Sequence, residues 1–307
     1  MISVLFPAYN EEANVAELHR QLIAVCNGLH EPYEIIAIDN ASTDKTAAVL
    51  QTLSPLTVVT FAYNIGQTAA LDAGIKQAQG DIVVILDGDL QNDPADIPRL
   101  LEKMREGYDG VVGWRQDRHD SMGRKIFSRF ANWLTRRIAG LDLHDYGCAL
   151  RAFRSELLRN IHLYGVMHVF IPVILADRGA RITEIPVQHH ERRAGISKYN
   201  FSKMATDLAD LLTIKFLYSY ALRPLVFFGT WALGSFAVAS IAVIASMIIK
   251  WQGIYGFSQT PLPVIAALFC ILSFLLLMLG FVVELLIRIY FESRGQTPYH
   301  IKSVATH

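Results

Sequence analysis

Two carboxylates separated by one residue, Asp87 and Asp89, are the side chains of this sequence that most clearly suggest a chemical function. They follow an apolar run at residues 82–86 and precede a helix-like segment, so they stand at the end of a predicted buried strand. Mg²⁺ takes oxygen ligands, usually one or two carboxylates, and leaves its other positions to water and substrate phosphates. The pair therefore predicts a binding site for Mg²⁺ or Mn²⁺ in an enzyme that acts on a nucleoside diphosphate compound. The alternative interpretation is a polar turn, because short acidic motifs have many chance matches.

Strand-like and helix-like segments alternate through the N-terminal region that must position this pair. Short runs rich in Val and Ile predict strands at residues 2–6, 33–39, 56–61, 81–86 and 110–113. Helical patterns cover residues 12–29, 43–53, 67–79 and 94–107, the last with Asp93 as N-cap before Pro94. The alternation predicts an α/β fold with a doubly wound, mostly parallel sheet.

Polar side chains gather where four of these strands end. In such sheets, ligands bind outside the carboxyl ends of the strands. Four clusters at successive strand ends therefore favour a nucleotide-type site over chance loop composition. In strand order the clusters are Tyr9, Asn10 and Glu11; Asp39, Asn40 and Asp44; Asn64, Gly66 and Gln67; and Asp87 with Asp89.

Two long segments near the C-terminus are free of charge. Residues 224–249 and 263–283 contain no Asp, Glu, Lys or Arg, and each exceeds the roughly 20 residues that cross a bilayer. Lys and Arg flank the pair on its outer sides, whereas the linker at residues 252–262 has none. By the positive-inside rule, both outer flanks are cytoplasmic and the linker is outside. The expected location is the inner (cytoplasmic) membrane, with two spans and a cytoplasmic catalytic domain.

The remaining composition narrows the class of protein. Lys and Arg balance Asp and Glu at 28 each, so global charge does not indicate a nucleic-acid partner. Three widely spaced cysteines form neither a disulfide framework nor a metal set, in agreement with a reducing compartment. The chain shows no charged region followed by a short apolar one at its start, so no signal peptide is expected.

Several motifs together resemble family 2 glycosyltransferases of GT-A fold. They are residues 6–12 (FPAYNEE), the loop at Asp39, Asn64-x-Gly66, Gly80-Asp81 and residues 87–91 (DGDLQ). Further features narrow the resemblance to polyprenyl-phosphate glycosyltransferases. They are residues 145–151 (DYGCALR), residues 192–199 (RRAGISKY), which begin with Arg192, and the two spans. The resemblance covers nearly the whole chain. Residues 39–42 (DNAS) depart from it, since the family usually has a second acid and a glycine there.

The resemblance implies a role for each matching residue. Pro7, Tyr9, Glu11, Asp39, Gly66 and Asp87 are implied to bind the donor nucleotide, and Asp87, Asp89 and Gln91 to organise the metal, the diphosphate and catalysis. The implied reaction is inverting transfer from a nucleoside diphosphate sugar to polyprenyl (undecaprenyl) phosphate. UDP is favoured over GDP by similarity to the bacterial members, and a homo-oligomer is expected. The sugar is left open.

A basic segment supplies the cations that two anionic substrates require. Between Trp114 and Arg137 there are seven Lys or Arg against two acids, with apolar residues at helical spacing on one side. This pattern predicts an amphipathic helix at about 123–139 on an anionic membrane surface, or else an ordinary packed surface helix. Arg124 and Ser128 are one helical turn apart and match the family's acceptor-phosphate pair. Arg115, Arg192 and Lys198 are further expected phosphate ligands, and Asp145 is either a sugar or acceptor contact or a turn residue.

The expected organisation follows from these segments. It runs from a catalytic domain at residues 1–200, through a juxtamembrane amphipathic helix at 201–222, span 223–251, linker 252–262 and span 263–291, to a tail at 292–307. Two alternatives remain open. A processive polysaccharide synthase would carry more spans and a Gln-x-x-Arg-Trp signature, and a non-catalytic nucleotide-sugar-binding membrane protein would bind without turnover.

Overall fold

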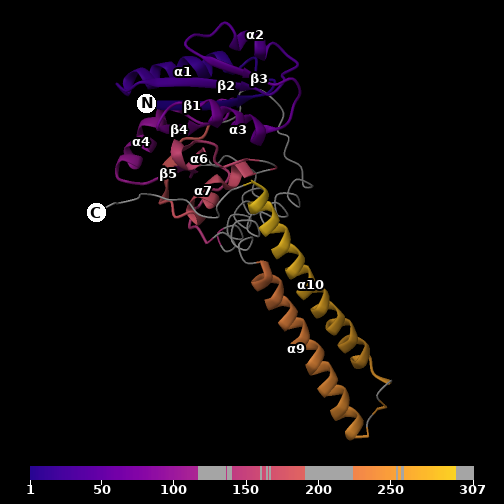
Figure 1. The fold of residues 1–307 in the computed structure, drawn as a ribbon. Helices are drawn as coiled ribbons and strands as arrows, with labels where there is room; N and C mark the ends of the chain where they lie inside the picture. Colours follow the sequence, from indigo (N-terminus) through magenta and orange to yellow (C-terminus); the bar gives the residue numbers. More distant parts are fainter. Residues whose placement is uncertain are drawn as a thin grey trace, which may run out of the picture. The chain divides into compact units, whose positions relative to one another are not determined.

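The computed structural model describes residues 1–116, 136, 140–159, 161–163, 165, 167–190, 224–253, 255–256 and 259–294 (Figure 1). The chain divides into two compact units, Met1–Ile214 and Lys215–His307, which are described separately. The expected membrane-surface helix at 123–139, apart from residue 136, and the expected juxtamembrane helix at 201–222 lie outside the described residues.

A seven-stranded sheet in the order β3-β2-β1-β4-β6-β5-β7 forms the first unit. Its strands are β1 (Ile2–Ala8), β2 (Tyr33–Asp39), β3 (Thr57–Thr60), β4 (Ile82–Ile85), β5 (Gly110–Arg115), β6 (Arg151–Arg154) and β7 (Ile182–Val187). Among these strands β6 alone runs against the others, since it is antiparallel to both β4 and β5. The predicted α/β fold with a mostly parallel sheet is therefore confirmed.

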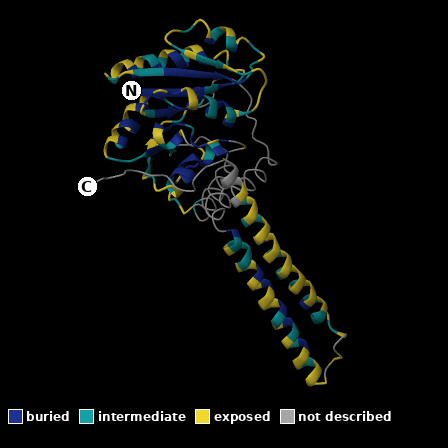
Figure 2. Cartoon of the chain, in the orientation of Figure 1, coloured by how far each residue is buried: buried dark blue, intermediate teal, exposed yellow. Residues whose placement is uncertain are grey.

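Helices lie on both faces of the sheet, as the strand–helix alternation requires. They are α1 (Val15–Gly28), α2 (Thr46–Leu50), α3 (Gln67–Gln77), η1 (Pro94–Asp96), α4 (Ile97–Arg105), α6 (Ser155–Leu158) and α7 (Met167–Asp177). Val4 and Phe6 of β1 belong to the core cluster that α1 and α4 help to form. Gly74 of α3 lies on the other side, against Leu5 and Ile38. Alternate residues of β1 thus face opposite layers, and β1 is almost entirely buried (Figure 2).

The local signals located most elements of this unit. Asp93 caps η1 as predicted, because its Oδ1 accepts a hydrogen bond of 2.9 Å from the Ala95 amide. The second helix is shorter than predicted and begins after Lys45, while the expected strands did not include β6 or β7. β6 has only four residues and starts with a buried arginine, so it lacks the apolar run that marks β4.

Two long apolar helices, α9 (Pro224–Trp251) and α10 (Leu262–Arg294), form the second unit at the positions of the two expected spans. Residues 224–251 and 262–287 are each long and apolar enough to cross a membrane. Large apolar side chains are exposed along both helices, which appear mostly exposed in Figure 2. A water-filled surround would make this exposure unfavourable, whereas lipid would not.

The faces on which α9 and α10 meet are made of small residues. Ala232, Ser235, Ala239, Ala242 and Ser246 are the buried residues of α9 beyond its first. Small side chains let two helix backbones approach closely in an apolar medium. A hydrogen bond joins the helices directly, from Ser273 Oγ to the Ala232 carbonyl at 2.8 Å.

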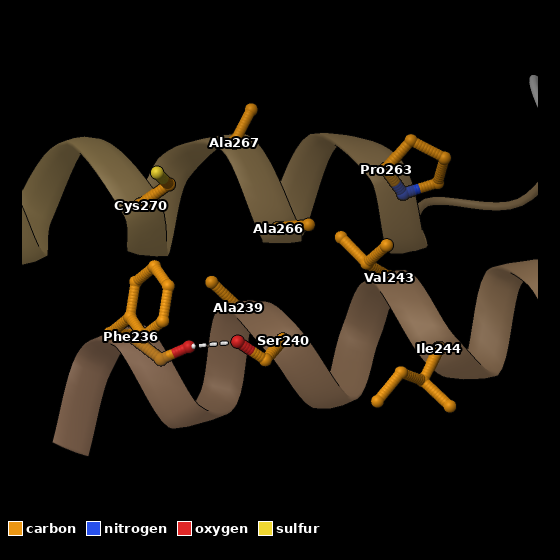
Figure 3. A pocket seen from close by; sticks show the side chains of 9 residues that line it. All are labelled: Phe236, Ala239, Ser240, Val243, Ile244, Pro263, Ala266, Ala267 and Cys270. Carbon is orange, nitrogen blue, oxygen red and sulfur yellow. Dashed lines mark hydrogen bonds between the residues drawn. The ribbon is translucent and has the colours of Figure 1, made fainter. Parts of the chain in front are cut away.

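An apolar recess lies between the two helices near the end that carries their connection (Figure 3). Its lining includes Phe236, Val243 and Pro263. The one hydroxyl in the lining, on Ser240, donates to the Phe236 carbonyl of its own helix at 2.9 Å. The recess therefore presents a hydrocarbon surface, as expected of a helix pair in lipid.

Candidate active site

The four predicted polar clusters converge at the carboxyl edge of the parallel strands. β1 pairs with β2 on one side, where Ala8 lies opposite Asp39, and with β4 on the other. β1 and β4 are also where the order of the strands reverses, which is where open α/β sheets hold their ligands. A Cβ on Gly88 would lie 2.8 Å from the Pro7 carbonyl oxygen, so the acidic loop passes directly over the end of β1. Glycine is required at that position by this close approach.

The loops after β1 and β2 are joined by hydrogen bonds. Asn10 Oδ1 accepts from the Thr43 amide at 2.8 Å, and the Glu11 amide donates to Thr46 Oγ1 at 2.8 Å. Asp39 is 1% exposed, and its Oδ1 accepts from the Ser42 amide at 3.1 Å. The segment at residues 39–42, where the sequence departs from the family pattern, thus folds around the Asp39 carboxylate.

The third cluster connects the second cluster to the acidic pair. Asn40 Nδ2 donates to Asn64 Oδ1 at 3.1 Å, and the Gly66 amide donates to the same oxygen at 3.0 Å. Gln67 is the first residue of α3, and its Nε2 donates to Asp87 Oδ1 at 2.6 Å. The polar residues that follow four different strands therefore form one continuous hydrogen-bonded array.

The acidic loop is also anchored to the segment that follows β7. The His190 amide donates to the Gln91 carbonyl at 2.9 Å, and His190 Nε2 lies 3.0 Å from Asp93 Oδ2. Asn92 forms an isolated antiparallel bridge with His189. The His189–His190 pair thus contacts the loop through its backbone and one ring nitrogen, which agrees with a structural role.

The donor atoms of the acidic loop fit a hard divalent cation. Asp89 is 5% exposed, and its Oδ1 accepts from the Gln91 amide at 3.1 Å, which holds the turn in shape. Among the described residues, no group of three or more His, Cys, Asp or Glu side chains is placed to hold a metal by itself. Mg²⁺ and Mn²⁺ do not need one, because substrate phosphates and water complete an oxygen shell begun by one or two carboxylates.

A buried ion pair faces this loop from the other half of the sheet. Arg115 ends β5 and forks onto Asp145, with Nε to Oδ2 at 2.6 Å and Nη2 to Oδ1 at 2.9 Å. Their side chains are 14% and 4% exposed. Burial by itself would lower the pKa of Arg115, but the fork with Asp145 outweighs burial and raises that pKa, and the charge of Asp87 adds to the rise. Arg115 is thus a fixed cation within electrostatic reach of the acidic loop.

The comparisons with known proteins agree with this geometry. The Glycosyl transferase family 2 model matches residues 3–161. The chain belongs to glycosyltransferase family 2. Dodecaprenyl-phosphate galacturonate synthase of Rhizobium johnstonii is 35% identical over 312 residues, which cover 99% of this chain and 92% of that protein. Undecaprenyl-phosphate 4-deoxy-4-formamido-L-arabinose transferase of Edwardsiella ictaluri is 36% identical over 311 residues, covering 99% and 94%.

Solved structures share the fold of this family 2 glycosyltransferase. Glucosyl-3-phosphoglycerate synthase from Mycobacterium tuberculosis, in complex with Mn²⁺, uridine diphosphate and phosphoglyceric acid, superposes with a TM-score of 0.56 at 21% identity. The match covers 71% of this chain and 77% of that one. The same enzyme in complex with Mn²⁺, UDP-glucose and phosphoglyceric acid also gives a TM-score of 0.56, at 22% identity. The GT-A fold expected from the sequence motifs is confirmed.

Not every expected site residue of the glycosyltransferase lies in the described part. Arg124, Ser128, Arg192 and Lys198 are outside the described residues. Arg115 and Asp145 lie together, and Asp145 Oδ1 also accepts from the Gly147 amide at 3.0 Å. Asp145 therefore combines the turn contact with an ion pair.

The sequence reasoning missed Arg151 as a separate member of the site. This residue is the first of β6 and lies opposite Ile85, two residues before Asp87. It is 4% exposed, which is unusual for an arginine. A signal was present, since Arg151 ends the motif at residues 145–151 and interrupts an otherwise apolar stretch, but its function is visible only in the structure.

Proposed function

We propose that this glycosyltransferase transfers a sugar from a nucleoside diphosphate sugar, with uridine as the base, to polyprenyl phosphate. The observation that carries the proposal is the convergence of Asp39, at the end of β2, with the Asp87/Asp89 pair after β4, on the two sides of the end of β1, in a chain that also has two membrane-length helices. Relatives of matching length act on dodecaprenyl or undecaprenyl phosphate, and the neighbouring fold binds UDP-glucose with Mn²⁺. The product is a polyprenyl-phosphate-linked monosaccharide for later glycan or lipid modification.

The donor is held by the array that joins the first four strand ends. In this proposal Asp39 accepts hydrogen bonds from the nucleoside, and Pro7, Tyr9, Glu11 and Gly66 complete the donor site. Asp87 and Asp89, with Gln91, would hold the Mg²⁺ or Mn²⁺ that accompanies the diphosphate. Such an ion offsets the charge that grows on a departing diphosphate.

The transfer itself needs positioning more than proton removal. An oxygen of the lipid phosphate attacks the anomeric carbon, a new carbon–oxygen bond forms, and the bond to the diphosphate breaks with inversion. The attacking oxygen is already ionised at neutral pH, so no dedicated general base is required. The remaining task is to hold two anions together, which fixed cations accomplish without reorganisation.

Cations for both substrates come from the second half of the domain. Arg124 and Ser128 are assigned to the acceptor phosphate, and Arg192 and Lys198 to phosphates of either substrate. The described segment after β7 ends at His190, two residues before Arg192, and the His190 amide donates to the Gln91 carbonyl. Because Arg192 follows this anchored segment in the sequence, the connection supports its assignment to a substrate phosphate.

The decisive experiment is product formation from a panel of sugar nucleotides. Purified protein is incubated with undecaprenyl phosphate, Mn²⁺ and one donor at a time, and the lipid fraction is analysed by mass spectrometry. We expect one donor to give a lipid heavier by a single sugar, with release of one nucleoside diphosphate. Addition of several sugars to one lipid would instead support a processive synthase, and donor binding without any product would contradict the proposal.

The acceptor side is proposed to be the cytoplasmic leaflet of the inner membrane. The support is the excess of Lys and Arg on the outer flanks of the two helices over the linker between them. A single cysteine placed at Ser258, in a background without the native thiols, should react with an impermeant maleimide in intact cells. A cysteine placed at His307 should react only after lysis, and the reverse pattern would place the site on the opposite leaflet.

A further inference from the structure

The guanidinium of Arg151 donates hydrogen bonds to backbone carbonyls of two separate segments. Nε donates to the Cys148 carbonyl at 2.6 Å, and Nη2 donates to the Tyr146 carbonyl at 2.8 Å. Nη1 donates to the carbonyls of His168 at 2.7 Å and Val169 at 3.2 Å, in the first turn of α7. These two segments are thereby joined through one planar, permanently charged group.

Proline in α7 explains why one of these carbonyls needs an outside donor. The His168 carbonyl would ordinarily accept from the amide four residues later, but residue 172 is proline and has no N–H. A carbonyl that is shielded from water and lacks a donor is costly, and Arg151 Nη1 from the sheet supplies a donor to this partly buried carbonyl. The α7 end of Arg151 is in this way fixed by the fold.

The other end of Arg151 holds the loop that carries Asp145. The two carbonyls that it binds flank Gly147, whose amide donates to Asp145 Oδ1 at 3.0 Å. The loop also approaches Arg115 closely, because a Cβ on Gly147 would lie 3.0 Å from Arg115 Nη2. A chain of contacts therefore runs from Arg151 through this loop to Asp145, and from Asp145 to the fork on Arg115.

Arg151 also has a place in the charge balance of the site. Among the residues that the structure describes, it has no ion-pair partner within contact distance, but the charges of Asp145 and Asp87 act favourably on it. Burial lowers the pKa of Arg151, yet a guanidinium stays protonated at any pH at which the protein works. Two cations, the partly buried Arg115 and the buried Arg151, thus lie within electrostatic reach of the acidic loop.

We propose that Arg151 is a positioning residue for sugar transfer, which clamps the Tyr146 and Cys148 carbonyls so that Asp145 keeps Arg115 aimed at the diphosphate site. This inference rests on the proposed function, because it assigns Arg115 to the phosphates of that reaction. Nothing in the role requires Arg151 to touch a substrate. Its effect on the reaction passes through Asp145 and Arg115.

A double-mutant cycle tests whether Arg151 acts through Arg115. Arg151→Lys keeps the charge but removes the planar fork that spans two carbonyls. We expect kcat to fall by about ten- to a hundredfold, since a displacement of about 1 Å at a reacting centre has such an effect. In an Arg115→Met background the same change should cost less than about twofold, because the group that it positions is already gone.

Two matched controls separate positioning from general loss of structure. Arg154→Met alters the other arginine of β6, which pairs with Asp109 instead, and should change kcat by less than about twofold. Pro172→Ala restores an N–H for the His168 carbonyl while leaving the loop bonds in place, and should likewise leave kcat unchanged. Equal losses from Arg151→Lys with and without Arg115 would overturn the proposal, as would an unchanged kcat in Arg151→Lys.

Failure of the proposed function would have a different signature. The wild-type protein would then transfer no sugar to polyprenyl phosphate. The double-mutant cycle of Arg151→Lys and Arg115→Met could still be measured by thermal unfolding and by calorimetry of UDP binding. Coupling between positions 151 and 115 in those two measurements would support the clamp. Additivity in both would overturn it.

Discussion

The two halves of the sheet build the same site by opposite routes. In β3, β2, β1 and β4 the strands are parallel, so the residues that follow each strand meet at one edge. β6 is antiparallel to both of its neighbours, so its first residue lies at that edge and the residues before it reach the site. Asp39 and Asp87 therefore arrive after a strand, whereas Asp145 and Arg151 arrive before or at the start of one.

The two halves also differ in how they hold charge. The first half is acidic at its edge, and its carboxylates accept hydrogen bonds from backbone amides and from Gln67. The second half holds two arginines, the partly buried Arg115 paired with Asp145 and the buried Arg151 bound to carbonyls. A diphosphate with its divalent ion needs both carboxylates and cations nearby. The first half of the sheet supplies the carboxylates and the second half supplies the cations.

The largest effect is expected in the first half, at Asp89. Asp89→Asn should lower kcat by roughly a thousandfold, because a carboxylate ligand of the divalent ion is worth several kcal/mol to the transition state. The measurement is sugar transfer at saturating Mn²⁺ together with a thermal unfolding curve. Asp81→Asn is the matched control, since Asp81 precedes the same strand at its opposite end and its side chain is 87% exposed. Full activity of the wild-type protein in excess chelator would contradict the assignment.

Loss of a carboxylate in the second half of the sheet should lower the free energy of unfolding more than a similar loss in the first half. Asp145→Asn leaves Arg115 buried without its counter-charge, and breaking a buried ion pair on one side costs about 3 kcal/mol or more in free energy of unfolding. Asp39→Asn, in the first half, should cost less in stability, because Asp39 faces an amide rather than a buried cation. Chemical denaturation of the three proteins makes the comparison. Asp142→Asn serves as a control, because that side chain is 80% exposed.

The acceptor assignment predicts an intermediate effect. Arg124→Ala should reduce acceptor efficiency about ten- to a hundredfold, since a charge-assisted hydrogen bond to phosphate is worth about 1.5–3 kcal/mol. Donor binding, followed by calorimetry with UDP, should stay nearly normal. Loss of UDP binding with normal use of polyprenyl phosphate would contradict this assignment and would place Arg124 at the donor instead.

The contrast between the halves also explains what the sequence predicted. Parallel strands with helical connections are visible as apolar runs and turn residues, and the rule that sites follow strands then located Asp39, Asp87 and Asp89. The same rule does not select residues that precede an antiparallel strand. β6 is only four residues long and begins with a charged residue, so neither its direction nor its boundary was predicted.

Arg151 shows the physical limit of that reasoning. Its partners are carbonyls at positions 146, 148, 168 and 169, and which carbonyls lack a donor depends on tertiary contacts. The Pro172 effect is local and readable from sequence, but only after α7 is known to lie beside β6. The pairing of Arg115 with Asp145 likewise joins residues 30 positions apart that carried separate predictions.

The smallest effect expected is a difference in the reactivity of two cysteines, one from each half. Cys26 of α1 and Cys148 beside Asp145 are 1% and 0% exposed, and burial raises the pKa of each to about 11. Both thiols are therefore protonated at neutral pH, and each reacts with iodoacetamide only when its surroundings open. In the wild-type protein we expect both to be slow, by mass spectrometry of peptides after timed labelling. In Asp145→Asn, Cys148 should become more reactive while Cys26 stays slow, because the lost ion pair loosens the loop and not α1. Equal acceleration of both thiols would mean that the two halves of the sheet open as one unit. The two halves would then differ in the chemistry that they contribute to the site but not in their local stability.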